Sequence, residues 1–147
     1  MRFLERFAEP SYALFRAVTG LLFMFHGLQK TVGVLGGFQP PVGSQLWIGG
    51  VIELVCGALV AAGLLTRFAA FLSSGTMAVA YVQFHWKLQL GAELLPAVNK
   101  GEPALLYAFA FLSIACRGGG RYAVDALLGR SAPGSERASG GPQRLSA

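Results

Sequence analysis

Glu53 is the one charged residue in the long apolar run from Trp47 to Leu65, so its position needs a physical reason. At membrane depth an ionisable side chain costs roughly 2.5–3.5 kcal/mol or more, and it normally faces a bundle interior or a wet cavity. On a helix Glu53 shares one stripe with small residues, which let a neighbouring helix approach closely. The stripe consists of Gly49, Glu53, Gly57 and Ala61. We therefore expect this face to point inward, and we favour a functional carboxylate over a structural Glu–Lys pair.

Further proton donors and acceptors are expected at a similar depth, toward one end of the helices. His26 and Lys30 are i,i+4 neighbours on one helix face. Two imidazoles, an ammonium and two carboxylates can exchange protons near physiological pH, as a proton-coupled or quinone-type site requires. We predict catalytic roles for Glu53 and His26. The predicted substrate-binding residues are Lys30, Tyr81, His85, Asn99 and Glu102.

Most of these residues also have a structural interpretation. Asn99 and Glu102 fit the N-x-x-E pattern of a helix capping box. His85 precedes a tryptophan and a lysine, a combination that suits the headgroup level of a membrane. His26 and Lys30 end a helix, where cations interact favourably with the helix dipole. For these residues the structural and functional alternatives both stay open.

Metal and thiol chemistry find little support in the residue spacing. Two histidines and two glutamates on four helices are similar to the set in carboxylate-bridged bundles, but the Glu-x-x-His motifs of those sites do not occur. Cys56 and Cys116 form no CxxC pair and are expected to serve packing. Glycine-rich phosphate loops, nucleophile elbows and dinucleotide fingerprints do not occur either. We therefore predict no metal site.

The composition is typical of a membrane protein. Of the 147 residues, 54% are hydrophobic and 13% are charged, whereas a soluble domain carries about 25% charged residues. The net charge of +5 does not indicate nucleic-acid binding, because the basic residues do not cluster with aromatic residues. The lipid bilayer is therefore the expected partner.

The apolar runs predict an all-α domain over residues 1–128, a four-helix transmembrane bundle. The expected spans cover about 12–30, 46–65, 68–85 and 103–116, followed by a disordered tail over 129–147. The first run is expected to be a span rather than a signal peptide, because no small-residue cleavage site follows it. Arg16 lies near one end of that span and is expected to snorkel to the interface. The short join Thr66-Arg67 predicts that the second and third spans form an antiparallel hairpin.

The basic residues predict the orientation of this bundle. An even number of spans places both termini on one side, together with nine arginines. These are Arg2, Arg6, Arg16, Arg67, Arg117, Arg121, Arg130, Arg137 and Arg144. The other side holds Lys30, Lys87 and Lys100. The positive-inside rule then predicts that both termini are cytoplasmic and that the polar residues around Glu53 lie toward the outer face.

In order and spacing, several motifs resemble those of the DoxX family of small four-helix membrane proteins. They are Arg16 with Gly20, Phe25-His26-Gly27-Leu28-Gln29-Lys30, the run from Gly50 through Glu53 and Gly57 to Thr66-Arg67, Asn99-Lys100-Gly101-Glu102, and Val124-Asp125. The resemblance covers about residues 10–128. It marks His26, Glu53, Asn99 and Glu102.

What the resemblance implies is a multi-pass protein of the bacterial inner membrane, related to subunits of quinone-linked oxidoreductases and associated with thiol or oxidative-stress functions. Quinone would then be the cofactor, and a soluble or membrane redox enzyme the partner; a homo-oligomer is compatible with the same family. The alternative is a non-enzymatic scaffold or small transporter in which Glu53 and Lys30 form a structural pair. The sequence does not decide whether this chain is itself catalytic.

Overall fold

The computed structural model describes residues 2–129, and every regular element in this part of the chain is helical. The all-α class is thereby confirmed. The tail predicted to be disordered falls almost wholly on residues 130–147, which lie outside the described range.

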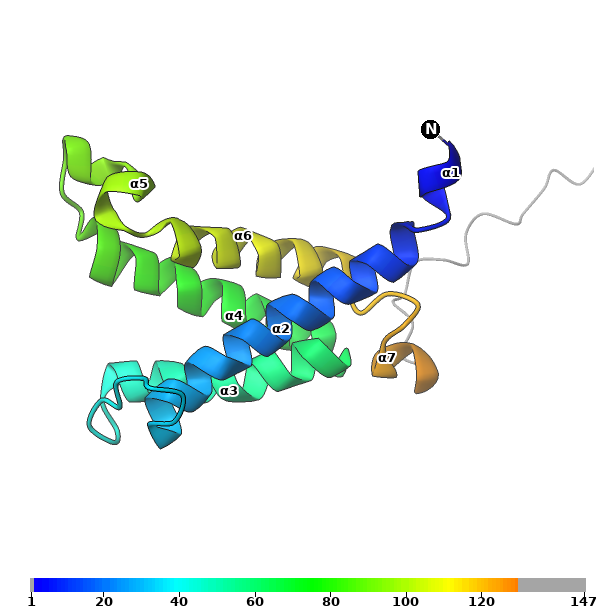
Figure 1. Ribbon diagram of the computed structural model, residues 1–147, viewed down its shortest axis with the longest axis horizontal. Helices are drawn as coiled ribbons and strands as arrows, with labels where there is room; N and C mark the ends of the chain where they lie inside the picture. Colours follow the sequence, from blue (N-terminus) through cyan, green and yellow to red (C-terminus); the bar gives the residue numbers. More distant parts are fainter. Residues whose placement is uncertain (1, 130–147) are drawn as a thin grey trace, which may run out of the picture.

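Four long helices make up most of the fold (Figure 1). They are α2 (Ala8–Val32), α3 (Gln45–Ala62), α4 (Thr66–Ala80), which continues as the π-helix η1 (Tyr81–Trp86), and α6 (Glu102–Arg117). The short elements are α1 (Arg2–Glu5), the 3-10 helix η2 (Ala92–Leu94), α5 (Pro96–Asn99) and α7 (Val124–Leu127). Among the described residues, α2 and α3 are long and apolar enough to cross a membrane.

Local sequence explains where α3 begins and where α2 and α3 end. The Ser44 side chain accepts a hydrogen bond from the Trp47 backbone N–H at 3.3 Å, so it caps the first turn of α3. Gly33 follows α2 and Gly63 follows α3, with φ angles of 73° and 75°. Glycine adopts this left-handed conformation without steric cost, which ends both helices.

The helices pack as two antiparallel pairs, α2 with α3 and α4 with α6. The chain does turn back sharply between α3 and α4, but these two helices diverge from their shared turn (Figure 1). The pairs therefore lie close together near this turn and far apart at the end that carries the α2–α3 loop and α5. Phe23 of α2 and Phe111 of α6 join the pairs, with ring centroids 4.6 Å apart and both side chains fully buried.

Close contact between α2 and α3 depends on glycines on both helices. A Cβ added at Gly27 would lie 2.2 Å from the backbone nitrogen of Leu54, and one added at Gly57 would lie 2.6 Å from that of Met24. Gly49, which the sequence placed on the packing stripe, has no atom within 4 Å of an added Cβ. The interhelical stripe on α3 therefore contains Gly50 and Gly57 rather than Gly49, because the packed face is turned by about one residue.

Arg16 does not snorkel, contrary to the expectation from its place near a helix end. Its side chain is buried, and the guanidinium donates hydrogen bonds to the carbonyl oxygens of Val60, Ala61 and Tyr122. The first two carbonyls belong to the last turn of α3, where backbone acceptors lack partners within the helix. Arg16 thus satisfies the end of α3 and fixes the loop before α7.

Two further side chains hold the same end of the molecule together. The Asp125 carboxylate accepts hydrogen bonds from the backbone N–H groups of Leu65 and Thr66 and from the Thr66 hydroxyl, at 2.8–2.9 Å, which caps α4. The Arg67 guanidinium donates to the last carbonyls of α6, those of Ala115, Cys116 and Arg117. These contacts tie the tight end of the two pairs to residues distant in sequence.

Candidate functional site

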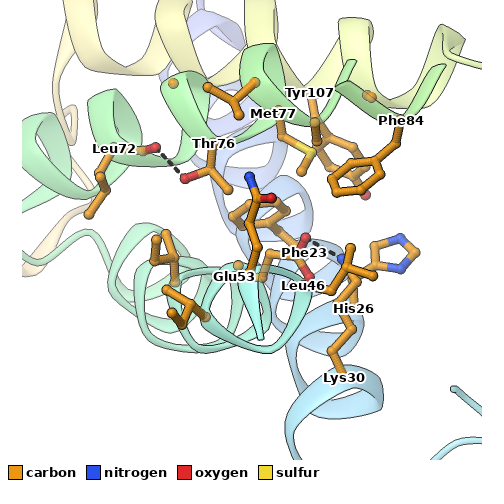
Figure 2. A pocket seen from close by; sticks show the side chains of 18 of the residues that line it. Phe23, His26, Lys30, Leu46, Glu53, Leu72, Thr76, Met77, Phe84 and Tyr107 are labelled. Atoms are coloured by element: carbon orange, nitrogen blue, oxygen red, sulfur yellow. Dashed lines mark hydrogen bonds and ion pairs between the residues drawn. The ribbon is translucent and has the colours of Figure 1, made fainter. Parts of the chain in front are cut away.

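A cavity of about 630 Å³ lies between the two helix pairs, toward the end where they diverge. Side chains from α2, α3, α4, η1 and α6 line it, and most of them are apolar (Figure 2). Its polar residues include Glu53, Lys30, His26, His85 and Tyr107. The divergence of α3 and α4 thus creates a space that four of the seven predicted site residues line.

Glu53 is 2% exposed, and one of its oxygens pairs with Lys30. Lys30 Nζ lies 2.5 Å from Glu53 Oε1. Gly50 makes room for the pair, because a Cβ there would lie 2.6 Å from Lys30 Cβ. The second oxygen, Oε2, is buried without a hydrogen-bond partner among the described residues. Such a group costs about 1–3 kcal/mol or more when left unsatisfied, so Oε2 is an acceptor whose hydrogen bond is not made within the protein.

His26 lies one helical turn before Lys30 and contacts Tyr107 across the cavity. The two rings meet edge to face, with centroids 6.2 Å apart. The His26 ring is exposed and makes no hydrogen bond within residues 2–129. The Tyr107 hydroxyl likewise makes none in that range. Both groups are therefore free to bind a molecule between the helix pairs.

The remaining predicted residues form a second group around α5. His85 Nδ1 lies 3.2 Å from the Asn99 carbonyl oxygen, and the Asn99 side chain donates to the Tyr81 hydroxyl at 3.4 Å. Tyr81 and His85 stack with ring centroids 6.5 Å apart, since both lie on the π-helix η1. Of these three residues, His85 lines the cavity, whereas Tyr81 and Asn99 hold α5 against η1.

Glu102 lies apart from both groups. It is the exposed first residue of α6 and does not line the cavity. The capping box with Asn99 is not formed, because the N-cap of α6 is Gly101 and Asn99 already ends α5. Lys100, with φ of 58°, separates the two helices. The Asn99 side chain instead accepts a hydrogen bond from the Gly101 N–H at 2.8 Å.

Tyr107 is a cavity residue that sequence reasoning missed. It lies in α6, on the face that also carries Phe111, and their rings stack with centroids 5.9 Å apart. The available signal was a phenol within an apolar span.

No cluster of three or more metal-ligating side chains occurs within residues 2–129. Cys56 is buried and Cys116 is exposed, and both thiols are free. The apolar cavity itself holds an ion pair, a carboxylate oxygen without a partner among the described residues, and the polar rings of His26, His85 and Tyr107.

The comparisons with known proteins agree with the motifs that run through this site. The DoxX family model matches residues 11–86. An "uncharacterized protein" of Haemophilus influenzae is 36% identical over 129 residues, which cover 85% of this chain and 96% of the relative. The chain belongs to the DoxX family. No solved structure gives a significant match.

Membership in DoxX bears on the environment of the protein. The family is membrane-associated, and the part of the chain that the structure describes has two helices long and apolar enough to cross a bilayer. The helical and membrane character expected from the sequence is therefore supported. Glu53, Lys30 and His26 lie within the matched residues, and Tyr107 lies outside them.

Proposed function

We propose that this DoxX protein is a multi-pass protein of the bacterial inner membrane, whose four long helices cross the bilayer and whose termini are cytoplasmic. Large apolar side chains on the outer faces of these helices support the proposal. Leu14, Phe68, Phe71, Leu106 and Phe109 are each 64–73% exposed. Such faces suit acyl chains, and α4 with η1 provides about the 20 residues that a span needs.

The proposed orientation is tested by reporter fusions. Fusions after Gln45 and Gly91 should report a periplasmic location, and fusions after Arg67 and at Ala147 a cytoplasmic one. The reason is that the positive-inside rule assigns the arginine-rich side of the bundle to the cytoplasm. Alkaline phosphatase and fluorescent-protein activities measure the two locations. A periplasmic signal after Arg67 would contradict the four-span topology.

The ligand proposed for the cavity is a lipophilic molecule with a hydrogen-bonding ring, such as a quinone or quinol. Phe71, Leu72 and Val79 of α4 line the cavity and also face outward, with exposed fractions of 38–68%. In the proposed topology these residues face the bilayer, so a ligand would enter between α3 and α4 from the lipid phase. At its inner end it would meet the unpartnered Glu53 Oε2, the observation on which the proposal depends.

This chain would then bind the ring and exchange protons with it. Glu53 Oε2 would accept a hydrogen bond from a quinol hydroxyl, while Tyr107 and His26 would contact the opposite side of the ring. The exposed His26 could pass protons between this site and water. Electron transfer is assigned to a partner, a quinone-linked oxidoreductase or a thiol or oxidative-stress enzyme.

A non-enzymatic scaffold or small transporter is the second candidate function, and the Lys30–Glu53 pair favours it. A direct ion pair at 2.5 Å satisfies one carboxylate oxygen within the protein. In this alternative the pair joins α2 to α3 and the cavity admits no ring. Ligand binding distinguishes the two functions.

Titration of the purified protein with a short-chain benzoquinol tests the first function. We expect a saturable rise in melting temperature for the wild type and about tenfold weaker binding for Glu53→Gln, because a hydrogen bond to a charged group is lost. Glu102→Gln is the matched control, since it removes a carboxylate at the same end but outside the cavity. Absence of saturable binding, or equal loss in both variants, would favour the scaffold or transporter.

A further inference from the structure

A second cavity, of about 600 Å³, lies at the opposite end of the molecule, between the start of α4 and the loop after α6. Its wall is basic and rich in glycine. Arg67, Arg117 and Arg121 line it together with the three glycines 118–120. Neither the family match nor the site around Glu53 accounts for this cavity.

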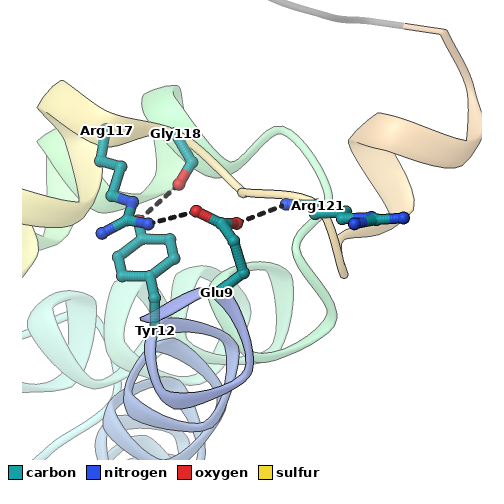
Figure 3. Close-up of polar contacts among 5 residues, drawn as sticks. All are labelled: Glu9, Tyr12, Arg117, Gly118 and Arg121. Carbon is teal, nitrogen blue, oxygen red and sulfur yellow. Dashed lines mark hydrogen bonds and ion pairs between the residues drawn. The ribbon is translucent and has the colours of Figure 1, made fainter. Parts of the chain in front are cut away.

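The three guanidinium groups around the cavity differ in how far they are engaged by other residues. Arg117 pairs with Glu9 at 2.5 Å and lies 3.9 Å from the centre of the Tyr12 ring (Figure 3). The Arg121 side chain points away from Glu9 and has no ion pair or hydrogen bond within the described residues. Arg67 donates to backbone carbonyls and has no carboxylate partner in that range.

The two carboxylates near these arginines are already engaged. Asp125 lines the cavity, but its oxygens accept three hydrogen bonds at the start of α4. Glu9 accepts the Arg121 backbone N–H at 3.4 Å in addition to its pair with Arg117. Three guanidiniums thus face two carboxylates, and the local charge is positive.

The loop backbone adds neutral donors to this positive wall. Gly118 and Gly120 have φ angles of 85° and 74°, a left-handed conformation that glycine adopts without steric cost. Neither residue has a side chain that could cover the loop backbone. The backbone N–H groups of Gly119 and Gly120 make no hydrogen bond to the rest of residues 2–129. Arginine forks and free backbone N–H groups together are the usual ligands of a phosphate group.

An apolar rim distinguishes this cavity from a site for a soluble anion. Leu65 and Phe68 line it and are 46% and 68% exposed. Phe71 lies one turn further along the same outer face of α4 and is 68% exposed. In the proposed topology α4 begins and α6 ends here, so the cavity lies at headgroup depth and its rim continues into the acyl region.

We propose that this cavity binds the phosphate group of an anionic phospholipid. The guanidiniums of Arg121 and Arg117 and the loop N–H groups hold the phosphate, while an acyl chain lies along Phe68 and Phe71. Basic pockets beside membrane helices bind anionic headgroups in this way. This inference requires the membrane placement, and its phosphate site shares no residue with the cavity around Glu53, although Phe71 lines that cavity.

Lipid titration of the full-length protein in detergent tests the proposal. Phosphatidylglycerol in mixed micelles should raise the melting temperature saturably, and Arg121→Gln should weaken the apparent affinity about tenfold, since it removes a charged hydrogen-bond donor. Arg121→Lys should give an intermediate loss, because the charge stays and the fork is lost. Because Arg121 is exposed, neither substitution should change the melting temperature of the protein without lipid. An unchanged value shows that the variants fold normally.

Arg6→Gln is the matched control. Arg6 lies near the same end of the molecule but does not line the cavity. Its guanidinium carbon lies 4.9 Å from the ring centre of Phe3 and 4.7 Å from that of Phe7. Its loss should leave lipid binding almost unchanged. Equal weakening by Arg6→Gln and Arg121→Gln, or equal binding of phosphatidylcholine, would overturn the proposal. Saturable stabilisation by inorganic phosphate alone, at similar concentrations, would overturn the lipid as the source of the phosphate.

Discussion

Lys30→Met is expected to destabilise the protein by about 3–5 kcal/mol, the cost found when one partner of a buried ion pair is removed. The Glu53 side chain is 3% exposed, so its carboxylate cannot turn to water once the ammonium is gone. Its second oxygen already lacks a partner within the described residues. Thermal and denaturant unfolding in detergent measure the loss.

The reverse change, Glu53→Gln, should cost less. The Lys30 side chain is 31% exposed and can move its ammonium toward water, and glutamine keeps the shape of the residue that it replaces. The double variant Lys30→Met with Glu53→Gln should recover most of the stability lost in Lys30→Met, because no charge is left stranded. Equal costs for the two single changes, with no recovery in the double variant, would contradict a coupled buried pair.

The same variants separate a structural from a functional carboxylate. If Glu53 serves structure alone, resistance to thiol or peroxide stress should follow melting temperature across the three variants. If Glu53 serves ligand binding, Glu53→Gln should fold and still lose resistance, and Lys30→Met in the double variant should not restore it. Wild-type stability together with wild-type resistance in Glu53→Gln would leave the carboxylate without either role.

The local pattern of apolar and charged residues predicts part of this fold. An apolar run interrupted by one carboxylate predicted an inward-facing Glu53, and the residue is 2% exposed. This feature was predictable because it depends on residues within a few turns of one another. The second expected span, by contrast, ran on to Leu65, whereas α3 ends at Ala62 and is capped by Gly63.

Contacts between distant segments could not be predicted in the same way. Arg16 was expected at the lipid interface, but its donors satisfy carbonyls at the end of α3, 44 residues away along the chain. Asp125 caps a helix about 60 residues before it. Which helices pair depends on such contacts, so the sequence indicated an α3–α4 hairpin but not that these helices diverge and form a cavity between them.

The polar residues predicted to form one site fall into two groups, again because of contacts that the sequence pattern does not show. His26, Lys30 and Glu53 meet because α2 and α3 pack closely along their glycines. Tyr81 and Asn99 instead fix α5 against η1, where the π-helix changes the direction of successive side chains. A uniform helical repeat cannot anticipate that local change, so the sequence placed all of these side chains at one depth without distinguishing their neighbours.

Substitutions at two glycines test the packed face of α2 and α3, where the sequence and the structure differ. Gly27→Ala is expected to destabilise the protein by about 3 kcal/mol, the upper part of the range for overpacked cores. The added methyl group would lie 2.2 Å from the Leu54 nitrogen and 2.7 Å from the Gly50 carbonyl oxygen, and backbone atoms cannot rotate away. The helices would have to separate, which would also disturb the Lys30–Glu53 pair.

Gly49→Ala is the matched control, with the opposite sign. An added Cβ there meets no atom within 4 Å, and alanine is favoured over glycine within a helix by about 0.8–1.0 kcal/mol. This variant should therefore unfold at the same temperature as the wild type or slightly higher. A loss in Gly49→Ala as large as that in Gly27→Ala would restore the stripe of Gly49, Glu53 and Gly57 as the packed face and would contradict the helix pairing described above.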